Sequence, residues 1–273
     1  MGSEYLVVGA TGMVGRHVVT ELERRDVAVR PAGRAGATVF DWDKPGTWAP
    51  ALAGVERAYV LWPQGTTQPQ HRMAEFVSAA ADTSLRRLVL LSAYGVDRAD
   101  GSGPRKAEQA VQDSGLDWTI LRPNWFLQNF SDGIFAPGIR ERRVIEAPAG
   151  DGLVSFVDTR DIAAVAATAL TGDGHTGEGY TITGPTAVTF ADVAAAISGV
   201  IGEPVGYRDA DPAGTRAGLL AAGVAPDYAD LLLGLFAGIV AGHNPTVTDV
   251  VERVTGRPAR DVATYARDNA AAW

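Results

Sequence analysis

The fold is decided by the stretch Tyr5-Leu6-Val7-Val8-Gly9-Ala10-Thr11-Gly12-Met13-Val14-Gly15-Arg16-His17-Val18-Val19. An apolar, β-branched run ends in a glycine, and apolar residues then recur with a helical period, which predicts a strand, a tight turn and a helix. Gly9 is expected to permit the bend, Gly12 to let the backbone approach a pyrophosphate, and Gly15 to let the helix pack closely on the strand. Glycines also punctuate ordinary turns, but the flanking strand and helix favour a dinucleotide as the ligand.

The composition is typical of a soluble globular protein. Its 273 residues are 46% hydrophobic, which is enough to bury a large core in one domain, or in one domain with an added lobe. The 24 basic and 32 acidic residues give a formal charge of -8, which disfavours nucleic acid and anionic membranes as partners. The longest apolar run, 231–242, is shorter than the roughly 20 residues that span a bilayer and is expected to form a buried helix.

Neither cysteine chemistry nor a metal site is expected. The chain contains no cysteine, which excludes disulfides, thiolate nucleophiles and cysteine-ligated metals. The histidines lack the spacing of metal ligands and lie at His17, His71, His175 and His243. Because the first strand is expected almost at the N-terminus, no signal peptide is expected, and the cytoplasm is the expected location.

Strand and helix patterns alternate over the first two thirds of the chain. They predict an α/β fold, a Rossmann-type doubly wound parallel sheet, in residues 1–150, with later returns of the chain at about 151–185. Residues 138–148 are expected to be a loop or a short strand. Residues 186–273 are expected to form a smaller, mostly helical lobe that covers the reactive end of the dinucleotide. Its helices around Leu219 and Leu231–Val240 are expected to supply the substrate pocket. The run 231–242 equally fits plain core or a dimer face.

The end of the second strand, expected at 27–30, indicates which dinucleotide is bound. NAD sites place an Asp or Glu there, roughly 20 residues past the glycines, and this chain has none. Arg30 and Arg34 instead offer guanidinium groups that can pair with a 2′-phosphate, which favours NADP(H) while leaving NAD(H) possible. Solvent-exposed arginines are the alternative. Asp41 and Trp42 follow the third strand, where an adenine can stack or form a hydrogen bond.

The ends of later strands supply further candidates, because ligands of open α/β sheets lie at the carboxyl edge. Leu61-Trp62-Pro63 follows the fourth strand and is expected to line the cofactor, with an ordinary turn as the alternative. Ser92-Ala93-Tyr94 follows the fifth strand, where the two hydroxyl groups are candidate hydrogen-bonding groups beside the nicotinamide.

Five segments occur in the same order as in a known family. They are Gly9-Ala10-Thr11-Gly12-Met13-Val14-Gly15, Leu88 to Gly95, Lys106-Ala107-Glu108, Thr119 to Asn129 and Val157 to Ala163. On these segments, and over nearly its whole length, the chain resembles the NmrA-like atypical short-chain dehydrogenase/reductases. That family includes NADPH:quinone oxidoreductases, ergot-alkaloid dehydrogenases acting on iminium ions, and redox-sensing regulators; residues 247–258 are similar to the ergot-alkaloid subgroup. The resemblance implies the fold but not the substrate, because one scaffold hosts many chemistries.

The chain departs from the usual short-chain reductase pattern at the proton donor. A Tyr usually lies four residues before the Lys, and here the position four before Lys106 holds Ser102. The resemblance implies that Lys106 holds the nicotinamide ribose, with a solvated helix lysine as the alternative. Tyr94 is the candidate replacement for the missing acid, with a packed aromatic side chain as the alternative.

The expected catalytic residues are Lys106, Tyr94 and Asn124. Residues expected to contact the cofactor are Gly9, Thr11, Gly12, Met13, Val14, Arg30, Arg34, Asp41, Trp42, Leu61, Trp62, Pro63, Ser92, Ala93, Lys106, Pro123, Asn124, Trp125 and Phe126. Asp158 and Asp161 are interpreted as helix-start residues that cap and complement the helix dipole, rather than as a paired-carboxylate site.

The predicted function is NADPH-dependent delivery of hydride to a planar small-molecule electrophile, an imine or iminium, a quinone or a conjugated carbonyl, with secondary metabolism as the expected setting. A site without a strong acid suits an iminium, whereas a simple ketone develops alkoxide charge that must be stabilised. The alternatives are a non-catalytic NADP(H)-sensing regulator and a redox-neutral isomerase or cyclase. A monomer and a homodimer both remain open.

Overall fold

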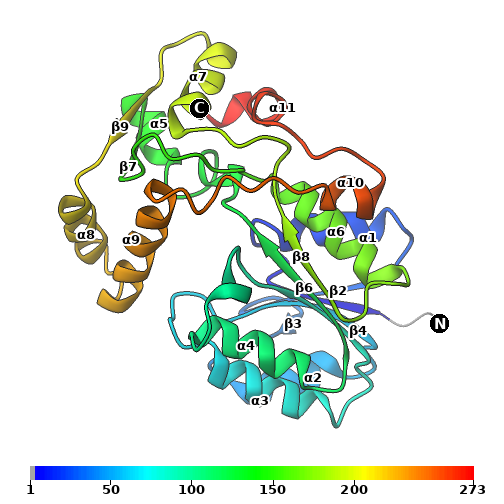
Figure 1. The fold of residues 1–273 in the computed structure, drawn as a ribbon. Helices are drawn as coiled ribbons and strands as arrows, with labels where there is room; N and C mark the ends of the chain where they lie inside the picture. The colour runs from blue at the N-terminus through cyan, green and yellow to red at the C-terminus, as the bar shows by residue number, and fades with distance from the viewer. Residues whose placement is uncertain (1–3) are drawn as a thin grey trace.

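A computed structural model describes residues 4–273, which are built around a seven-stranded sheet (Figure 1). The strands lie in the order β3-β2-β1-β4-β5-β6-β8, and all neighbouring pairs are parallel. Their bounds are β1 Tyr5–Val8, β2 Val29–Gly33, β3 Thr38–Val39, β4 Arg57–Leu61, β5 Arg87–Leu91, β6 Asp117–Pro123 and β8 Glu178–Ile182. The order reverses between β1 and β4, which makes their carboxyl ends the switch point where such sheets bind ligands. The predicted doubly wound parallel sheet is confirmed.

Helices cover both faces of the sheet, because successive strand residues point to opposite sides. In β1, Val7 belongs to the hydrophobic cluster of one face, which also contains residues of α1 (Gly15–Glu23), α6 (Thr159–Thr171) and α10 (Val250–Thr255). Leu6 and Val8 pack with the helices of the other face, α2 (Trp48–Leu52), α3 (Gln70–Ala80) and α4 (Gly103–Gln112). Figure 1 shows these two layers above and below the strands.

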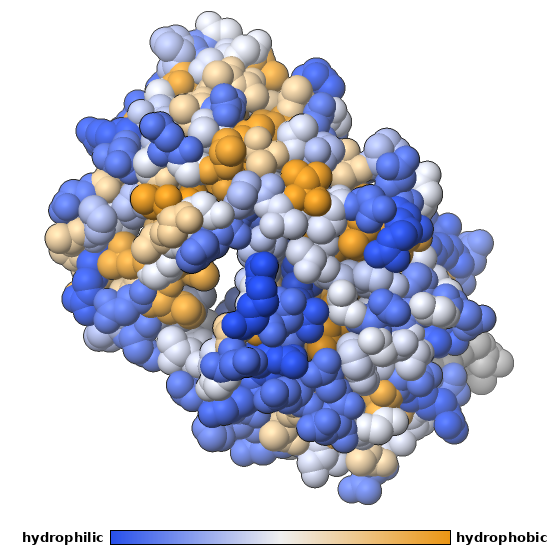
Figure 2. All heavy atoms as spheres, in the orientation of Figure 1, coloured by the Kyte–Doolittle hydropathy of each residue, from blue (hydrophilic) through white to orange (hydrophobic). Residues whose placement is uncertain are grey.

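A third hydrophobic cluster forms a lobe beyond the carboxyl edge of the sheet (Figure 1). Its helices are α5 (Ala136–Arg142), α7 (Phe190–Ile201), α9 (Pro226–Val240) and α11 (Val262–Asp268), and α8 (Pro212–Ala221) packs on α9. A parallel pair, β7 (Val144–Ala147) and β9 (Gly206–Asp209), completes it. Short 3₁₀ helices are η1 Pro45–Thr47, η2 Val96–Arg98, η3 Leu127–Asn129 and η4 Ala270–Ala272. Figure 2 shows the surface hollowed between α9 and the sheet layer.

Residues 127–156 pack in this lobe, although the expected division at residue 150 placed them mostly with the sheet. Phe130, Phe135 and Phe156 form ring contacts with Phe190 of α7 at centroid distances of 5.2 to 5.8 Å. Strand β7 pairs only with β9 among the described strands. We therefore propose that the lobe comprises 127–156 as well as 186–273, except for α10, which packs with the sheet layer.

The segment 138–148 differs from the loop or short strand expected for it. Residues Ala136–Arg142 form α5, and only Val144–Ala147 is extended. Pro137 lies in the first turn of α5, where its fixed φ is compatible with a helix, and Arg143 ends the helix in a left-handed conformation (φ 55°). Gly138 is needed for close packing, since a Cβ there would lie 2.8 Å from the carbonyl oxygen of Val144. The turn-forming residues of this segment therefore serve helix packing.

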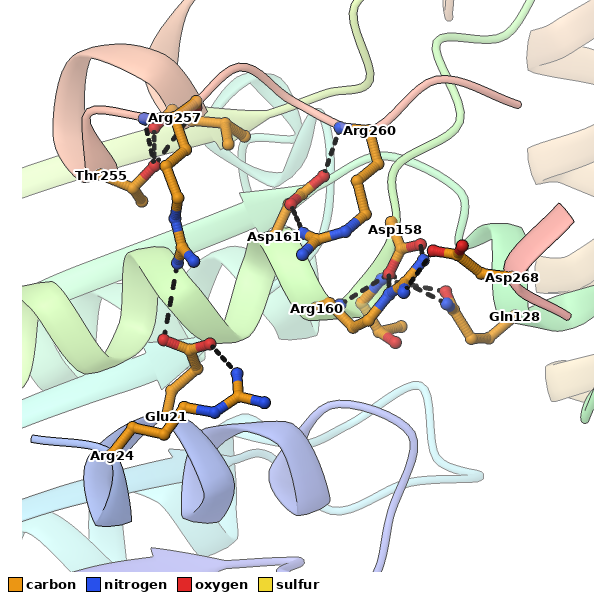
Figure 3. Close-up of polar contacts among 12 residues, drawn as sticks. Glu21, Arg24, Gln128, Asp158, Arg160, Asp161, Thr255, Arg257, Arg260 and Asp268 are labelled. Atoms are coloured by element: carbon orange, nitrogen blue, oxygen red, sulfur yellow. Dashed lines mark hydrogen bonds and ion pairs between the residues drawn. The ribbon is translucent and has the colours of Figure 1, made fainter. Parts of the chain in front are cut away.

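Ion pairs hold the C-terminal segment against α6 (Figure 3). Asp158 caps α6 by accepting from the amide of Arg160, and its carboxylate also pairs with the Arg160 guanidinium at 2.6 Å. Arg160 reaches Asp268 at 2.7 Å, and Asp161 pairs with Arg260 and accepts from its amide at 2.7 Å. Asp158 and Asp161 are both buried. Their interpretation as structural residues at a helix start is confirmed.

Within residues 4–273, no helix combines the length and the apolar content needed to cross a bilayer. Over the same range, no group of three or more His, Asp or Glu side chains is arranged to hold a metal ion. The apolar run 231–242 lies largely in α9, but α9 is not the buried helix expected, because Leu231, Leu235 and Val240 are exposed.

Candidate functional site

The glycine turn after β1 has the geometry that its sequence predicts. Gly9 has a φ of +71°, in the left-handed region that favours glycine. A Cβ on Gly15 would lie 2.8 Å from the carbonyl carbon of Gly9 and closer still to its oxygen, so any side chain at Gly15 would push α1 away from the turn. Gly9 and Gly15 thus have the bending and packing roles assigned to them.

The N-terminus of α1 presents free backbone donors. Its N-cap is Val14, which has no side-chain capping bond, and the amides of Met13 and Val14 donate to no acceptor within residues 4–273. Such amides, together with the helix dipole, bind phosphate groups. Gly12 packs closely within the turn, since a Cβ there would lie only 3.1 Å from the carbonyl oxygen of Gly9. The turn therefore fits the pyrophosphate of a dinucleotide.

A cavity of about 420 Å³ extends from this turn along the carboxyl ends of β1, β4 and β5. It brings together Gly9, Gly12, Met13, Val14, Leu61, Trp62, Pro63, Ser92, Ala93, Tyr94 and Phe126, all of them expected from the sequence. Helix α9 closes the other side with Tyr228, Leu231 and Leu235. In Figure 2 the cavity lies in the hollow beside α9.

Arg30 does not lie at this cavity. Strand β2 extends to Gly33, so Arg30 lies near its amino end, opposite Leu6, whereas cofactors lie at carboxyl ends. Its guanidinium pairs with Glu4 at 2.6 Å and donates to the carbonyl oxygens of Ala51 and Ala53. Arg30 therefore does not have the position expected of a residue that binds a 2′-phosphate.

Arg34 lies directly after β2, at the carboxyl edge of the sheet, and is exposed. Its guanidinium forms no ion pair or hydrogen bond within residues 4–273. The hydrogen bond from the Asp43 amide and the nearby Lys44 hold the pKa of Asp41 below its usual value, and the charge of Arg34 adds a smaller lowering. The contact of Arg34 with a 2′-phosphate stays a prediction.

Trp42 packs against the protein rather than lining the cavity. Its ring contacts Phe40, Trp48 and Phe76 at centroid distances of 5.0 to 5.7 Å. This aromatic cluster builds the wall beside the end of β3, and Trp42 keeps part of its surface accessible there. The expected adenine contacts of Asp41 and Trp42 remain predictions.

Three residues expected at the site hold α9 and the segment that follows it, residues 243–246, which we call the strap. The Tyr94 hydroxyl donates to the carbonyl of His243 at 3.0 Å. The buried Asn124 amide donates to the carbonyl of Asn244 at 3.0 Å and accepts from the Asn244 side chain at 3.1 Å. Trp125 packs on Phe236 of α9 at 4.9 Å. Tyr94, Asn124 and Trp125 therefore fix α9 over the cavity, and of the three only Tyr94 also lines it.

Lys106 is exposed and does not line the cavity. In α4, Pro104 lines the cavity and Ala107 and Glu108 face the sheet, whereas Lys106 lies two residues from Pro104, about 200° around the helix. Thr11 is exposed at the turn and Pro123 is buried in β6, and neither lines the cavity. The structure thus does not bring Lys106 together with the other expected residues.

The helix around Leu231 was expected to supply the pocket, and Leu231 and Leu235 do line the cavity, whereas Leu219 of α8 does not. Sequence reasoning missed Tyr228 and Glu108. Tyr228 lies three residues before Leu231, so helical spacing was the available signal for it. Glu108 was quoted only as part of a family segment, yet it is fully buried behind Ser92 and accepts from its hydroxyl. No sequence pattern relates Glu108 to Ser92, which lies 16 residues away.

Loss of the Asn124–Asn244 contact is expected to destabilise the strap. Asn124→Ala and Asn244→Ala should each lower the free energy of unfolding by about 2 kcal/mol, because each leaves buried polar groups unpaired. The double variant should cost clearly less than the sum, since the two side chains share hydrogen bonds. Urea denaturation measures these energies, with Asn129→Ala, whose side chain forms no hydrogen bond within residues 4–273, as the control. Strict additivity would show that the two residues act separately.

Comparisons with known proteins show the family to which the chain belongs. Residues 9–173 match a family model described as NAD(P)H-binding. The chain is 35% identical to an NAD(P)H azoreductase of Xenophilus azovorans, over 98% of both chains. It is also 35% identical to a (4-alkanoyl-5-oxo-2,5-dihydrofuran-3-yl)methyl phosphate reductase of Streptomyces griseus, again over 98% of both. The solved NADPH-dependent quinone oxidoreductase of Escherichia coli, complexed with NADPH, shares the fold at a TM-score of 0.82 and 24% identity, covering 97% of this chain and 99% of its own.

The family match covers the glycine turn, the strand ends and α6, and it agrees with the donors that the turn presents to a dinucleotide. The chain is therefore an NAD(P)H-dependent oxidoreductase, and it belongs to the NAD(P)H-binding family, among the NmrA-like atypical short-chain dehydrogenase/reductases.

Proposed function

We propose that this protein reduces a planar, conjugated small molecule, such as a quinone, an azo compound, an iminium ion or a conjugated carbonyl, with NADPH. The observation that carries the proposal is the cavity, in which the apolar stripe of α9 faces the ends of β4 and β5. Leu231 and Leu235 are 37% and 44% exposed, so their side chains offer apolar surface to a ligand. The reduced nicotinamide supplies the hydride when bound, and the protein orients the acceptor and excludes water.

The polar groups around the cavity support an acceptor that needs no strong acid. Ser102, at the position where a Tyr is usual, caps α4 by accepting from the amide of Arg105. The hydroxyls of Ser92 and Tyr94 both donate to protein acceptors, Glu108 and the carbonyl of His243. A simple ketone would develop alkoxide charge with few donors to stabilise it. A quinone instead delocalises the negative charge that it gains on reduction, and an iminium loses its positive charge.

The function is tested by measuring NADPH oxidation with purified protein and a panel of quinones, azo dyes, cyclic iminium ions and conjugated ketones, with cyclohexanone as the negative control. Turnover of at least one conjugated class, and none of cyclohexanone, is expected. Leu235→Ala should raise the KM for the accepted substrate roughly fivefold by removing apolar contact. Val240→Ala is the matched control, because Val240 lies on the same helix, is 61% exposed and does not line the cavity.

Absence of turnover across the panel, with tight NADPH binding retained, would favour the alternative of a non-catalytic NADP(H)-sensing protein. A cavity closed by α9 supports the enzyme, because a sensor needs no space beside the nicotinamide. The cytoplasmic location stays a prediction, and a monomer and a homodimer both stay open as oligomeric states.

Preference for NADP(H) over NAD(H) is assigned to Arg34. Arg34→Ala is expected to weaken NADPH binding roughly 30-fold and NADH binding less than twofold, because a guanidinium–phosphate pair stabilises the complex by about 2 kcal/mol. Fluorescence titration with each reduced nucleotide measures both constants. Arg30→Ala is the control, since Arg30 is already paired with Glu4 and should leave the NADPH to NADH ratio unchanged. Equal losses of both nucleotides in Arg34→Ala would exclude the phosphate contact.

A further inference from the structure

Ser92 lies at the cavity, but its hydroxyl proton points away from it. The side chain follows the end of β5, is 6% exposed and lines the cavity. Its Oγ donates to Oε1 of Glu108, which is fully buried behind it. A serine hydroxyl has one proton and two lone pairs, so this hydrogen bond leaves only acceptor capacity on the cavity side.

The partners of Glu108 explain why Glu108 cannot donate a hydrogen bond to Ser92. Nε and Nη2 of Arg122 donate to the two Glu108 oxygens at 2.8 Å each, and Nη1 of Arg105 donates to one of them at 3.1 Å. A protonated acid here would leave two guanidinium groups without a counter-charge in a largely buried position. Glu108 is therefore a carboxylate that only accepts, and Ser92 must be its donor.

We propose that Glu108 is a positioning residue that holds Ser92 as a hydrogen-bond acceptor for the nicotinamide riboside half of the bound cofactor. A dinucleotide crosses the switch point with its pyrophosphate at the glycine turn. With the adenosine half over β2, beside Arg34, the nicotinamide half extends over β4 and β5, where Ser92 lies. The donors on that half are the ribose hydroxyls and the carboxamide NH₂. A serine that can only accept a hydrogen bond pairs with one of these donors.

The inference rests on the proposed function only in its use of a nicotinamide cofactor. It also deepens that function, because a serine whose proton is held by Glu108 cannot donate to an alkoxide forming on a substrate. The hydrogen bonds around Glu108 therefore prevent Ser92 from stabilising the alkoxide that a simple ketone would form.

Nucleotide binding tests the proposal without any substrate. Ser92→Ala is expected to weaken NADP⁺ binding roughly tenfold, by loss of one hydrogen bond, and to leave adenosine 2′,5′-bisphosphate binding unchanged, because that probe lacks the nicotinamide half. Calorimetric titration measures both. Ser114→Ala is the matched control, because the Ser114 hydroxyl donates to a backbone carbonyl at the end of α4, away from the cavity. Wild-type affinity of Ser92→Ala for NADP⁺ would overturn the proposal.

A double-mutant cycle tests the positioning role of Glu108. Glu108→Gln lets an amide N–H point at Ser92 and frees the serine proton, so NADP⁺ affinity should fall as in Ser92→Ala. In the double variant the two losses should not add, because both act through the same hydroxyl. Additive losses would show that Glu108 acts independently of Ser92. If Glu108→Gln does not fold, Ser92→Ala alone still decides whether the serine contacts the cofactor.

The nicotinic acid analogue of NADP⁺, which has a carboxylate in place of the carboxamide, separates the two donors. If Ser92 accepts from the carboxamide, Ser92→Ala should not weaken binding of this analogue; if it accepts from the ribose, both nucleotides should lose the same factor. A cycle that behaves as expected while no substrate of the panel is reduced would count against the proposed function alone.

Discussion

Gly15→Ala is expected to weaken NADP⁺ binding on the order of 100-fold and to lower the free energy of unfolding by about 3 kcal/mol. The new Cβ would lie 2.8 Å from the carbonyl carbon of Gly9 and 3.2 Å from Cα of Ala10. These are backbone atoms, so no side chain can rotate away, and α1 must move by about 1 Å relative to the turn. The amides of Met13 and Val14 would then no longer converge on one phosphate position.

Titration calorimetry with NADP⁺ and urea denaturation measure the two effects of Gly15→Ala. The control is Gly46→Ala, because a Cβ on Gly46 meets no atom within 4 Å and its backbone needs no left-handed conformation. That variant should bind NADP⁺ as the wild type does. Unchanged binding in Gly15→Ala would mean that the closeness of α1 to the turn does not matter for the cofactor.

Asp158→Asn is expected to lower the free energy of unfolding by about 3 kcal/mol at neutral pH, because it leaves the partly buried Arg160 guanidinium without its nearest counter-charge. The Asp158 side chain is fully buried and pairs with Arg160 at 2.6 Å (Figure 3). An asparagine can still cap α6, so the loss reports on the ion pair rather than on the cap. Urea denaturation measures it.

The pH dependence of this loss separates Asp158 from its neighbour Asp161. Burial opposes ionisation of Asp158, but hydrogen bonds from Arg160 outweigh it and hold its pKa below the ordinary 3.8. The unfolded state therefore binds this proton more readily, so the stability that the ion pair contributes is fully present above pH 3.8 and is lost as the pH falls below it. The difference between wild type and Asp158→Asn should shrink there.

Asp161→Asn is the matched comparison, because burial raises the pKa of Asp161 despite the lowering effect of Arg260. Here the folded state binds the proton more readily, so ionisation of Asp161 costs stability as the pH rises above 3.8. The wild type should therefore gain stability relative to Asp161→Asn as the pH is lowered through that range. Parallel changes in the two variants would contradict the assigned pKa directions.

Much of the sheet layer could be predicted because its signals are local. The turn at Gly9 and the helix that begins at Gly15 depend on residues within one or two turns of each other, and both lie where the pattern predicted them. The second strand was predicted too early, at 27–30, because its extent is set by pairing with β1, from Tyr5 opposite Val29 to Val8 opposite Ala32. Because β2 spans Val29–Gly33, Arg30 lies near its amino end, away from the cofactor edge, whereas Arg34 directly follows its carboxyl end.

The site was predictable only in part, for the same reason. Strand-end residues such as Leu61 and Ser92 were found because all parallel strands end at one edge. The assignment of Lys106 came from a resemblance, and its position on the solvent side of α4 could be read only from how that helix packs. Asn124 was expected to act on the cofactor, whereas its buried hydrogen bonds hold Asn244.

By itself, the sequence determined the glycine turn, the alternation of strands and helices and hence the doubly wound sheet, because each of these depends on residues adjacent in the chain. Only the tertiary structure decided which side chains meet at the cavity. Tyr228 and Leu235 line the same cavity as Ser92 and Trp62. The segment after α9 is held there by hydrogen bonds between Asn124 and Asn244, which lie 120 residues apart. Contacts over such distances are set by packing and by the pairing of buried polar groups, and no local pattern encodes them.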